Sequence, residues 1–413
     1  MPEQIKIEPK AYLLKNKIQN YEWGAKGSEA VIPKLLGIQP EEGKPYAELW
    51  IGAHAKAPSV VVLPEGKEVS LNELIEKFPE EVLGKDVSKK FDGKLPFLLK
   101  VLSASEALSI QAHPDKTKAG ILHLKDPKNY PDDNHKPEIA IALDSLKALV
   151  GFKPLDKFLA ALESYGGLKD FAGSRIVDEI QKSSLSEEDK VKTLYEEIIK
   201  KSVSNPDELE TAVEEIKTES LRKEPGLRTE EENLFLELEN QYGTDVGLFS
   251  VLLFNLVKLK EGEGIFLDAG IPHAYLKGNI IECMANSDNV VRVGLTPKFK
   301  DVDSLLEILS YNLHPVEIIN SNSSEKEENI YQVPISEFEI TRWKFTNDSV
   351  RVIDNSSVSI LLIVEGSISV ELNGMMESYK KGDSLLIPAM VKELKINFSK
   401  GSLVFRAFIP EAR

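Results

Sequence analysis

The chain has 413 residues, about two to three times the usual length of one domain, so we expect more than one hydrophobic core. Its 42% apolar and 29% charged residues are typical of soluble globular proteins and exclude the disordered and fibrous classes. The formal charge of −16 argues against nucleic-acid partners, and so does the lack of a stretch that combines clustered Lys and Arg with aromatic residues.

The N-terminal segment, Met1 to Lys10, alternates charged and apolar residues and lacks the apolar core of a signal peptide. The longest nearly apolar run, Val246 to Val257, is shorter than the roughly 20 residues that span a bilayer, and it predicts a buried strand or helix. With Cys283 as the single cysteine, no intrachain disulfide can form, which fits a reducing compartment. We expect a cytoplasmic protein with no membrane partner, and we expect a monomer.

Three segments follow one another in the first 320 residues. From Leu95 to Leu143, short apolar or alternating runs are broken by Pro, Asp and Asn, which predicts antiparallel strands and loops. From Leu155 to about Glu239, apolar residues recur three and four apart in Lys/Glu-rich stretches, which predicts helices. After Gln241 the strand pattern returns in FSVLLFNLVKLKEGEGIFLDAG and in IIECM and NVVRV. The helices are therefore predicted to be inserted between two halves of one β-domain.

A polar stretch from Asn320 to Asn329 is predicted to be a linker. After it, VSILLIVEGSISVEL, GDSLLIP and LVFRAFIP indicate short strands of a second small β-domain. The predicted fold class is therefore mainly β with an α-helical domain. The predicted domains are 1–154 with 241–318, then 155–240, then 319–413.

Candidate metal ligands occur in three short motifs. In LSIQAHPD, strand alternation places Ser109, Gln111 and His113 on one face, although a solvent-facing strand would show the same pattern. In NHKPEIAIAL, Glu138 stands at the start of an apolar strand. In EGEGIFLDAGIPHAYLKG, His273 follows a Gly/Pro turn with the glycine spacing of the second half of a cupin metal motif, although Asp268 and Lys277 replace the usual Pro and Asn.

Together, Gln111, His113, Glu138 and His273 supply an amide oxygen, two imidazoles and a carboxylate. This set suits Zn²⁺ or another divalent transition ion with positions left open for water or substrate. Two histidines and one carboxylate are also the ligand set of non-haem iron oxygenases, so a cupin dioxygenase is an alternative. A cupin that only binds sugar phosphates is another. Gln111 and the nearby cations argue against the first alternative, and a potential base beside the metal argues against the second.

Glu282 and Arg292 are equally distant from Ser287, so a hairpin turn centred there would place them on facing strand positions. An ordinary cross-strand salt bridge would explain the same spacing. Beside a metal, the two would form an acid/base and anion-binding pair, with Arg292 lowering the pKa of Glu282.

Several long strings resemble type I mannose-6-phosphate isomerases in order along the first 300 residues. They are NYEWG, AELWIGAHAKAPS, LSIQAHPDK, NHKPE, PHAYLKG and ECMANSDNVVRVGLTPK. The resemblance implies a metal-bearing cupin (jelly-roll β-barrel) domain, a helical domain and a second cupin-like domain. It implies one zinc per chain on the four ligands named above. The remaining site residues that it implies are catalytic Arg292, Glu282 and Lys136, with Lys100, Ser109, Trp23 and Glu48 binding substrate or lining the rim.

The implied reaction is the reversible aldose–ketose isomerisation of mannose 6-phosphate and fructose 6-phosphate through a cis-enediol, which supplies mannose 6-phosphate for GDP-mannose synthesis. The partner is then a small-molecule sugar phosphate. Glu282 is the predicted base, with Lys136 as its rival, and Lys100, Lys136 and Arg292 are available to the phosphate. Because no Gly-rich nucleotidyltransferase segment precedes the motifs, we expect no fused GDP-mannose-synthesising activity.

In the last segment, the cupin spacing counted from Gly366 places the two histidine positions at Leu372 and Gly374. The third falls on Glu393 when counted from Gly382. One carboxylate does not make a stable transition-metal site. We therefore expect a metal-free cupin-like domain with a structural role, its interior filled by apolar side chains. The residues expected to fill it are Leu361, Ile363, Leu385 and Ile387.

Overall fold

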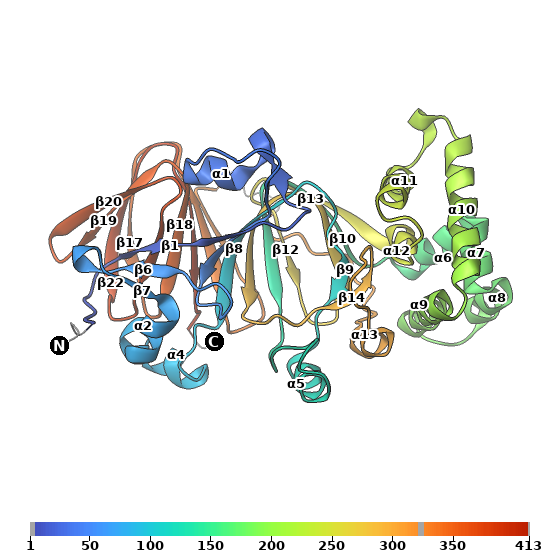
Figure 1. Ribbon diagram of the computed structural model, residues 1–413, viewed down its shortest axis with the longest axis horizontal. Coiled ribbons are helices and arrows are strands. Elements are labelled where there is room, and N and C mark those ends of the chain that lie inside the picture. The colour runs from blue at the N-terminus through green and yellow to red at the C-terminus, as the bar shows by residue number, and fades with distance from the viewer. Residues whose placement is uncertain (1–4, 321–325, 412–413) are drawn as a thin grey trace.

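The computed structural model describes residues 5–320 and 326–411. Three regions follow one another along the long axis of the molecule (Figure 1): the C-terminal strands at one end, a central group of strands, and most of the helices at the other end. Of the predicted linker from Asn320 to Asn329, residues 321–325 lie outside the described part. Glu328 and Asn329 already belong to a strand, β15 (Glu328–Tyr331).

The central sheet has nine strands, with β11, β10, β13, β8, β5 and β2 as consecutive antiparallel neighbours. β12 pairs with β10, and β9 pairs with both β13 and β14. Their bounds are β2 (Lys17–Gln19), β5 (Glu48–Gly52), β8 (Phe97–Ala104), β9 (Ile110–Ala112), β10 (Glu138–Phe152), β11 (Phe254–Lys260), β12 (Gly264–Leu267), β13 (His273–Ala285) and β14 (Val291–Gly294). The two longest strands, β10 and β13, pair along almost their whole length, so they hold the sheet together.

β10 and β13 bend part-way along their length, and the bend divides this sheet into two parts, which we call its walls. One wall contains β8 and β5, and the other contains β9 and β14. The register shifts between Ala142 and Leu146, opposite Gly278 of β13. Gly278 has φ +138°, and a Cβ there would lie 2.1 Å from the carbonyl oxygen of Ser145. Beyond the bend, His273 pairs with Gln111 of β9, whereas the later part of β13 pairs with β8. The chain can make this bend only where one strand lacks a side chain.

We expect Gly278→Ala to lower the free energy of unfolding by about 2–4 kcal/mol, because the new methyl group meets backbone that cannot move cheaply. Gly37→Ala is the matched control. Gly37 also has a positive φ, +65°, but apart from its neighbours along the chain no heavy atom lies within 4 Å of its Cβ position, so it should lose only about 1 kcal/mol. Urea unfolding of both variants measures the difference, and equal losses would mean that the close contact does not define the bend.

The C-terminal strands form an eight-stranded sheet and a four-stranded sheet. The four-stranded sheet contains β17 (Ser349–Asp354), β22 (Glu393–Phe398), β19 (Ser367–Leu372) and β20 (Met375–Lys380). The eight-stranded sheet contains, in order, β15, β16 (Glu339–Lys344), β23 (Leu403–Phe408), β18 (Ser359–Glu365), β21 (Ser384–Ile387), β1 (Tyr12–Lys15), β6 (Val60–Val62) and β7 (Glu68–Ser70). A separate two-stranded sheet pairs β3 (Ala25–Lys26) with β4 (Pro45–Tyr46).

Three N-terminal strands therefore belong to the sheet of the C-terminal region. β1 pairs with β21 through Tyr12 opposite Leu386, and β6 and β7 follow it at the edge. Tyr12 and Leu14 are buried in the core that the two large sheets share. The strand pairing thus crosses the boundary predicted at residue 319, since β1 lies between β6 and β21, and β21 is more than 360 residues later in the chain.

Two apolar cores connect these sheets. One lies between the nine-stranded and eight-stranded sheets and includes Leu99, Ile281, Ile360 and Phe405. The other lies between the eight-stranded and four-stranded sheets. It contains the four side chains predicted to fill the second β-region, Leu361, Ile363, Leu385 and Ile387, each at most 1% exposed. The prediction of an apolar interior in this region is confirmed.

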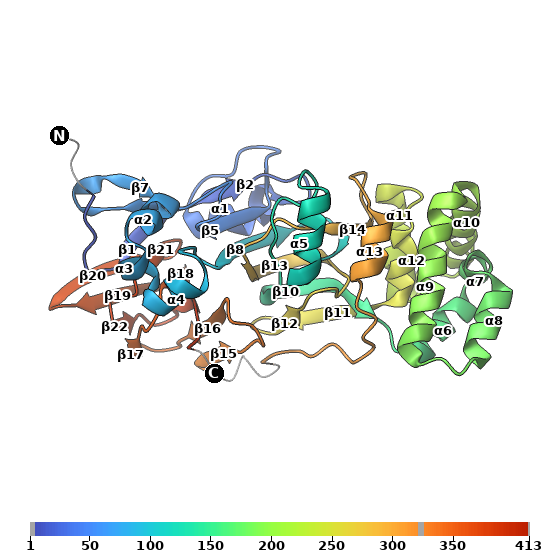
Figure 2. The same ribbon diagram turned by 90° about the horizontal axis from the view of Figure 1, so that it is seen from below.

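The helices of the predicted helical segment are α6 (Leu155–Ser164), α7 (Gly166–Ala172), α8 (Ser174–Lys182), α9 (Glu187–Ser204), α10 (Pro206–Arg222) and α11 (Glu230–Tyr242). They gather at one end of the molecule (Figures 1 and 2). α9 buries Val191, Leu194, Tyr195, Ile198 and Ile199, the apolar residues spaced three and four apart. α11 begins with a capping box between Thr229 and Glu232.

The remaining α-helices are α1 (Val31–Leu36), α2 (Leu71–Lys77), α3 (Pro79–Leu83), α4 (Lys85–Lys90), α5 (Lys116–Lys125), α12 (Gly247–Leu253) and α13 (Val302–Ile308). One of them differs from the prediction, and another decides between two predicted alternatives. α5 lies in a segment predicted as strands and loops, and Asp115 caps it by accepting a hydrogen bond from the Lys118 amide. α12 lies in the first part of the apolar run Val246 to Val257, for which the sequence predicted a buried strand or helix. All of its residues are buried, and periodicity cannot separate a buried helix from a buried strand.

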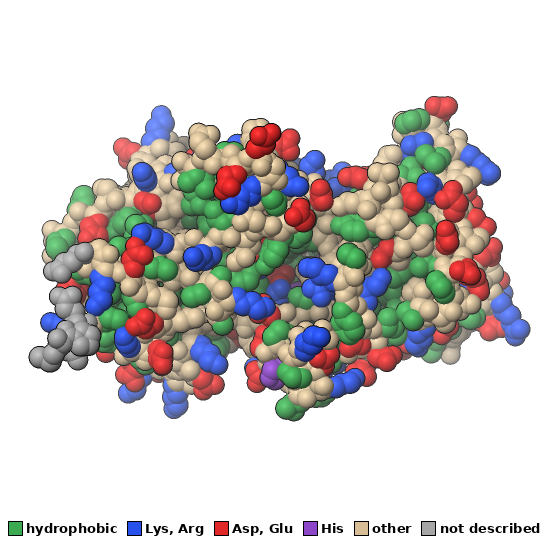
Figure 3. Space-filling view, in the orientation of Figure 1, with side chains coloured by type: hydrophobic (Ala, Val, Ile, Leu, Met, Phe, Trp, Pro, Cys, Tyr) green, Lys and Arg blue, Asp and Glu red, His purple; other side chains and the backbone are tan. Residues whose placement is uncertain are grey.

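Short 3₁₀ turns occur at Gly27–Glu29, Pro64–Gly66 and Pro225–Leu227. Within the described ranges, no helix has both the length and the apolar character required to cross a membrane. The face in Figure 3 carries acidic and basic side chains interspersed with one another rather than a continuous basic patch.

Candidate active site and metal centre

One wall of the bent sheet carries charged side chains on its inner face. Glu282 of β13 pairs with Lys100 of β8, and Lys100 pairs with Trp50 of β5. Directly opposite residues in adjacent strands point to the same face, so these side chains lie together. Their sequence neighbours on β8, Leu99 and Val101, point the other way into the core between the sheets. Strand alternation thus places apolar side chains on the face toward the core and charged side chains on the face between the two walls, which we call the polar interior.

The other wall supplies a second set of side chains. Gln111 of β9 pairs with His273 at the start of β13 on one side and with Arg292 of β14 on the other. His113 lies two residues after Gln111, so it continues the same face. The residues of LSIQAHPD and PHAYLKG therefore meet because β9 inserts between β13 and β14.

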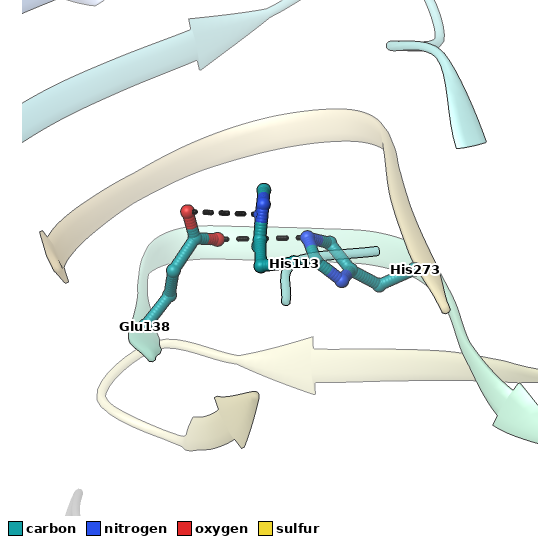
Figure 4. Close-up of side chains that lie close together, drawn as sticks. All are labelled: His113, Glu138 and His273. Carbon is teal, nitrogen blue, oxygen red and sulfur yellow. Dashed lines mark ion pairs between the residues drawn. The ribbon is translucent and has the colours of Figure 1, made fainter. Parts of the chain in front are cut away.

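Three predicted ligands converge between the walls. His113, Glu138 and His273 are all buried, and their ligand atoms lie within 4.8 Å of one another. The Nε2 atoms of His113 and His273 are 3.4 and 3.5 Å from the two carboxylate oxygens of Glu138 (Figure 4). Both Nε2 atoms and Glu138 Oε2 are buried without a hydrogen-bond partner. Buried polar atoms are rarely left unpaired, so this arrangement fits a divalent cation held among them.

Backbone carbonyl groups orient both imidazoles. His113 Nδ1 lies 2.7 Å from the Asn289 carbonyl oxygen, and His273 Nδ1 lies 2.9 Å from that of Ile271. Because a carbonyl oxygen only accepts, each Nδ1 carries the hydrogen and each Nε2 presents its lone pair. Burial, assisted by the charge of Lys136, lowers the pKa of His113 to about 4. His113 is therefore neutral at pH 7, the form that binds metals.

Glu138 is a carboxylate in this setting. Its burial alone would favour the neutral acid, but the charge of Lys136, whose Nζ lies 3.0 Å from Oε1, holds the pKa of Glu138 well below its usual range. Lys136 is itself buried. Gln111 is partly buried beside these groups, opposite His273.

Lys100, not Arg292, is the partner of Glu282. Lys100 Nζ lies 2.8 Å from Glu282 and 3.8 Å from Glu48, and the Trp50 indole N–H donates to Glu48. The hairpin predicted between Glu282 and Arg292 is wrong: residues 286–290 lead into β14, which pairs with β9 instead of β13. Within the described residues no ion pair joins Glu282 to Arg292.

The pKa of Glu282 also differs from the expectation. Burial raises the pKa of Glu282 above its usual value, and the nearby Glu138 and Glu48 charges add to this effect, although Lys100 opposes it. For Lys100, burial alone would lower the pKa, but the charges of Glu282 and Glu48 outweigh it and raise the pKa. A cation thus sits among three carboxylates in a water-poor interior.

Arg292 is partly buried, and burial lowers the pKa of its guanidinium below the usual value while leaving it charged. In the described part of the chain it takes part in no ion pair. A partly desolvated guanidinium without a carboxylate partner is suited to an anionic ligand.

Ser109 and Trp23 were also predicted to bind or border the substrate. Ser109 is partly buried and lies directly before β9, two residues from Gln111. Trp23 packs against the apolar side of the interior, and its carbonyl accepts hydrogen bonds from Ser105 and Glu106. Tyr275 was missed by the sequence analysis. Its hydroxyl is buried without a hydrogen-bond partner, and its position two residues after His273 in PHAY was the signal that could have found it.

The chain is similar in sequence to phosphomannose isomerases from several organisms. Residues 12–155 match the family described as phosphomannose isomerase type I, catalytic domain. A mannose-6-phosphate isomerase of Ogataea parapolymorpha is 38% identical over 90% of this chain and 91% of its own length. One of Rattus norvegicus is 36% identical over 97% of this chain and 98% of its own length. The chain belongs to the type I phosphomannose isomerase family.

Solved structures of phosphomannose isomerases agree with this membership. An arginine-to-alanine variant of phosphomannose isomerase from Salmonella typhimurium has a TM-score of 0.83 and 32% identity, covering 97% of this chain and 99% of its own. A mannose 6-phosphate isomerase bound with zinc and yttrium has a TM-score of 0.82 and 32% identity, covering 97% of this chain and 100% of its own. The family resemblance thus extends over the helical and C-terminal regions as well as the matched residues 12–155.

Proposed function

We propose that this chain is a zinc-dependent mannose-6-phosphate isomerase. The observation that carries the proposal is the convergence of three unpaired, buried ligand atoms, from His113, Glu138 and His273, in a member of the phosphomannose isomerase family. A related structure is bound with zinc, and neutral imidazole with carboxylate is a ligand set that zinc prefers. The substrate is a sugar phosphate.

The proposed zinc ligands are Gln111, His113, Glu138 and His273. Support for Gln111 comes from its place opposite His273 and on the face of His113. When bound, zinc supplies a Lewis acid that polarises sugar oxygens. Besides its predicted catalytic role, Lys136 supports the metal site, because its ion pair with Glu138 keeps that ligand ionised.

Proton transfer is assigned to Glu282. Isomerisation requires ring opening and then movement of a proton between C2 and C1 of the open sugar, with a cis-enediol between the two forms. A general base is most effective when its pKa approaches the working pH, and burial raises the pKa of Glu282 in that direction. Lys100 stays protonated beside it and stabilises its carboxylate form before the first transfer and after the second. Lys136 is the rival base, but its contact with Glu138 occupies its ammonium group.

The phosphate and the developing negative charge need cations that are not already neutralised. Arg292 is proposed for this role because it is partly desolvated and has no ion pair within the described residues. Ser109, Trp23 and Glu48 are proposed to bind or border the sugar, with Lys100 linking Glu48 to Glu282. A dioxygenase would need none of these cations.

For the domains, we propose two cupin-type β-regions and a helical insertion over 155–240. The catalytic region combines the strands of 1–154 and 241–318, and the metal-free region follows residue 319, with β1, β6 and β7 completing its sheet. The apolar interior of the second region supports a structural role. The single cysteine supports a reducing compartment, and the cytoplasmic location and monomeric state stay predictions.

A coupled assay that follows fructose 6-phosphate formed from mannose 6-phosphate tests the proposal. We expect turnover with this substrate, and no oxygen uptake when Fe²⁺ replaces zinc. Tight binding of mannose 6-phosphate without any turnover would instead favour a sugar-phosphate-binding protein, and oxygen uptake would favour a dioxygenase.

A further inference from the structure

Two loops meet on the outer side of the metal centre. Residues 131–137 lead into β10 and carry Lys136 ahead of Glu138. Residues 286–290 connect β13, which carries Glu282, to β14, which carries Arg292. The geometry of four proposed site residues therefore depends on how these two loops are held against each other.

Asp132 makes most of the contacts between the loops. Its carboxylate accepts hydrogen bonds from Ser287 Oγ at 2.8 Å and from the Asp288 amide at 2.7 Å, and also from the Asn134 amide in its own loop at 3.0 Å. Its carbonyl oxygen accepts from Asn289 Nδ2 at 2.7 Å. One residue thus contacts three consecutive residues of the opposite loop through both its side chain and its backbone.

Asn289 transmits these contacts to the metal centre. Its side chain is completely buried, and Nδ2 donates to the carbonyl oxygens of Asp132 and Asn134. Its own carbonyl oxygen accepts from His113 Nδ1 at 2.7 Å. This last bond selects the tautomer in which His113 Nε2 faces Glu138 and His273.

We infer that Asp132 is a positioning residue for zinc: it holds residues 287–289 in the conformation in which the Asn289 carbonyl orients His113. The inference rests on the proposed metal site and adds a residue that touches neither metal nor substrate. Partners that orient a metal-bound histidine typically change metal affinity by about 10- to 100-fold when they are removed. A residue that served only to join two loops would change the stability of the metal-free protein and leave zinc affinity as it is.

The adjacent residue is a matched control. Asp133 has the same side chain one position later, but it is exposed and forms an ion pair with Lys116 at 3.7 Å rather than a contact with residues 287–289. Asp132→Ala removes the four hydrogen bonds that the carboxylate accepts, from the Asn134 and Asp288 amides, Ser287 Oγ and Asn289 Nδ2. Asp132→Asn keeps one oxygen acceptor but turns an NH₂ group toward one of the donors, so it should restore part of the affinity. Ser287→Ala leaves the Asp132 side chain in place and removes the contacts of the Ser287 hydroxyl with the Asp132 carboxylate, the Asn134 carbonyl oxygen and the Asn289 amide.

The experiment measures zinc affinity of the full chain by competition with a chromophoric chelator, alongside far-UV circular dichroism of each metal-free variant. We expect Asp132→Ala to bind zinc about 10- to 100-fold more weakly than the wild type, Asp132→Asn to be intermediate, and Asp133→Ala to stay within about twofold. Ser287→Ala should weaken zinc binding by about 3- to 10-fold. If Asp132→Ala does not fold, the zinc affinity of Ser287→Ala tests the inference in its place.

Wild-type affinity in a folded Asp132→Ala would overturn the inference, as would wild-type affinity in Ser287→Ala if Asp132→Ala does not fold. An equal loss in Asp133→Ala would also overturn it, since the effect would then follow the loop's charge rather than these contacts. Failure of the wild-type chain itself to bind zinc would count against the proposed metal site instead, so the two failures are distinguishable.

Discussion

His113→Ala is expected to lose both zinc and turnover. The substitution removes one of the two imidazoles that face Glu138 and leaves three proposed ligands, so zinc should be held too weakly to survive purification. Because the bound metal contributes several kcal/mol of transition-state stabilisation, kcat/KM should fall by at least about 10³-fold. Elemental analysis of the purified variant and the coupled assay measure the two effects.

His123→Ala is a matched control for this variant. His123 also places its Nδ1 2.7 Å from a backbone carbonyl oxygen, that of Tyr130, but it lies on α5 and outside the metal-binding cluster. It should retain zinc and turnover. If His113→Ala kept a full complement of zinc, the assignment of His113 as a ligand would have to be abandoned.

Glu282→Gln is expected to lower kcat by about 10²- to 10⁴-fold while zinc stays bound, because it removes the proposed base but none of the proposed metal ligands. The amide keeps the size of the side chain. Lys100 loses its closest carboxylate but retains Glu48 at 3.8 Å, so the charge is not left wholly without a partner. Steady-state kinetics measures kcat, elemental analysis measures the zinc content, and thermal unfolding measures the stability of the variant.

Glu232→Gln tests whether loss of any buried, lysine-bound glutamate would have the same result. Glu232 is 1% exposed and pairs with Lys223, but it lies in α11 of the helical region. Its replacement should reduce stability without reducing kcat. Near-normal kcat for Glu282→Gln would transfer the role of base to Lys136 or another group.

The local part of the site could be predicted from the sequence. Strand alternation in LSIQAHPD predicted Gln111 and His113 on one face, and the glycine spacing before PHAY singled out His273. In the structure Gln111 pairs with His273, and His273 lies close to His113. These inferences needed only neighbours within a few residues. The meeting of His113, Glu138 and His273 was a hypothesis that joined separate motifs, and the structure brings the three together.

The partners of the charged residues could not be predicted in the same way. Glu282 and Arg292 are close in sequence, whereas Glu282 and Lys100 are 182 residues apart, and only the register of β13 against β8 brings them together. A turn between two strands does not establish that they pair, because a third strand can insert, as β9 does here. The same difficulty hid the pairing of β1 with β21.

The most direct test of the account is a titration of metal-free protein with zinc while turnover of mannose 6-phosphate is followed. Zinc is removed with a chelator, its absence is checked by elemental analysis, and turnover is measured after each addition of zinc. Turnover is predicted to be negligible at the start and to rise in proportion to bound zinc until one ion per chain is present. Full turnover in the metal-free protein would contradict the account.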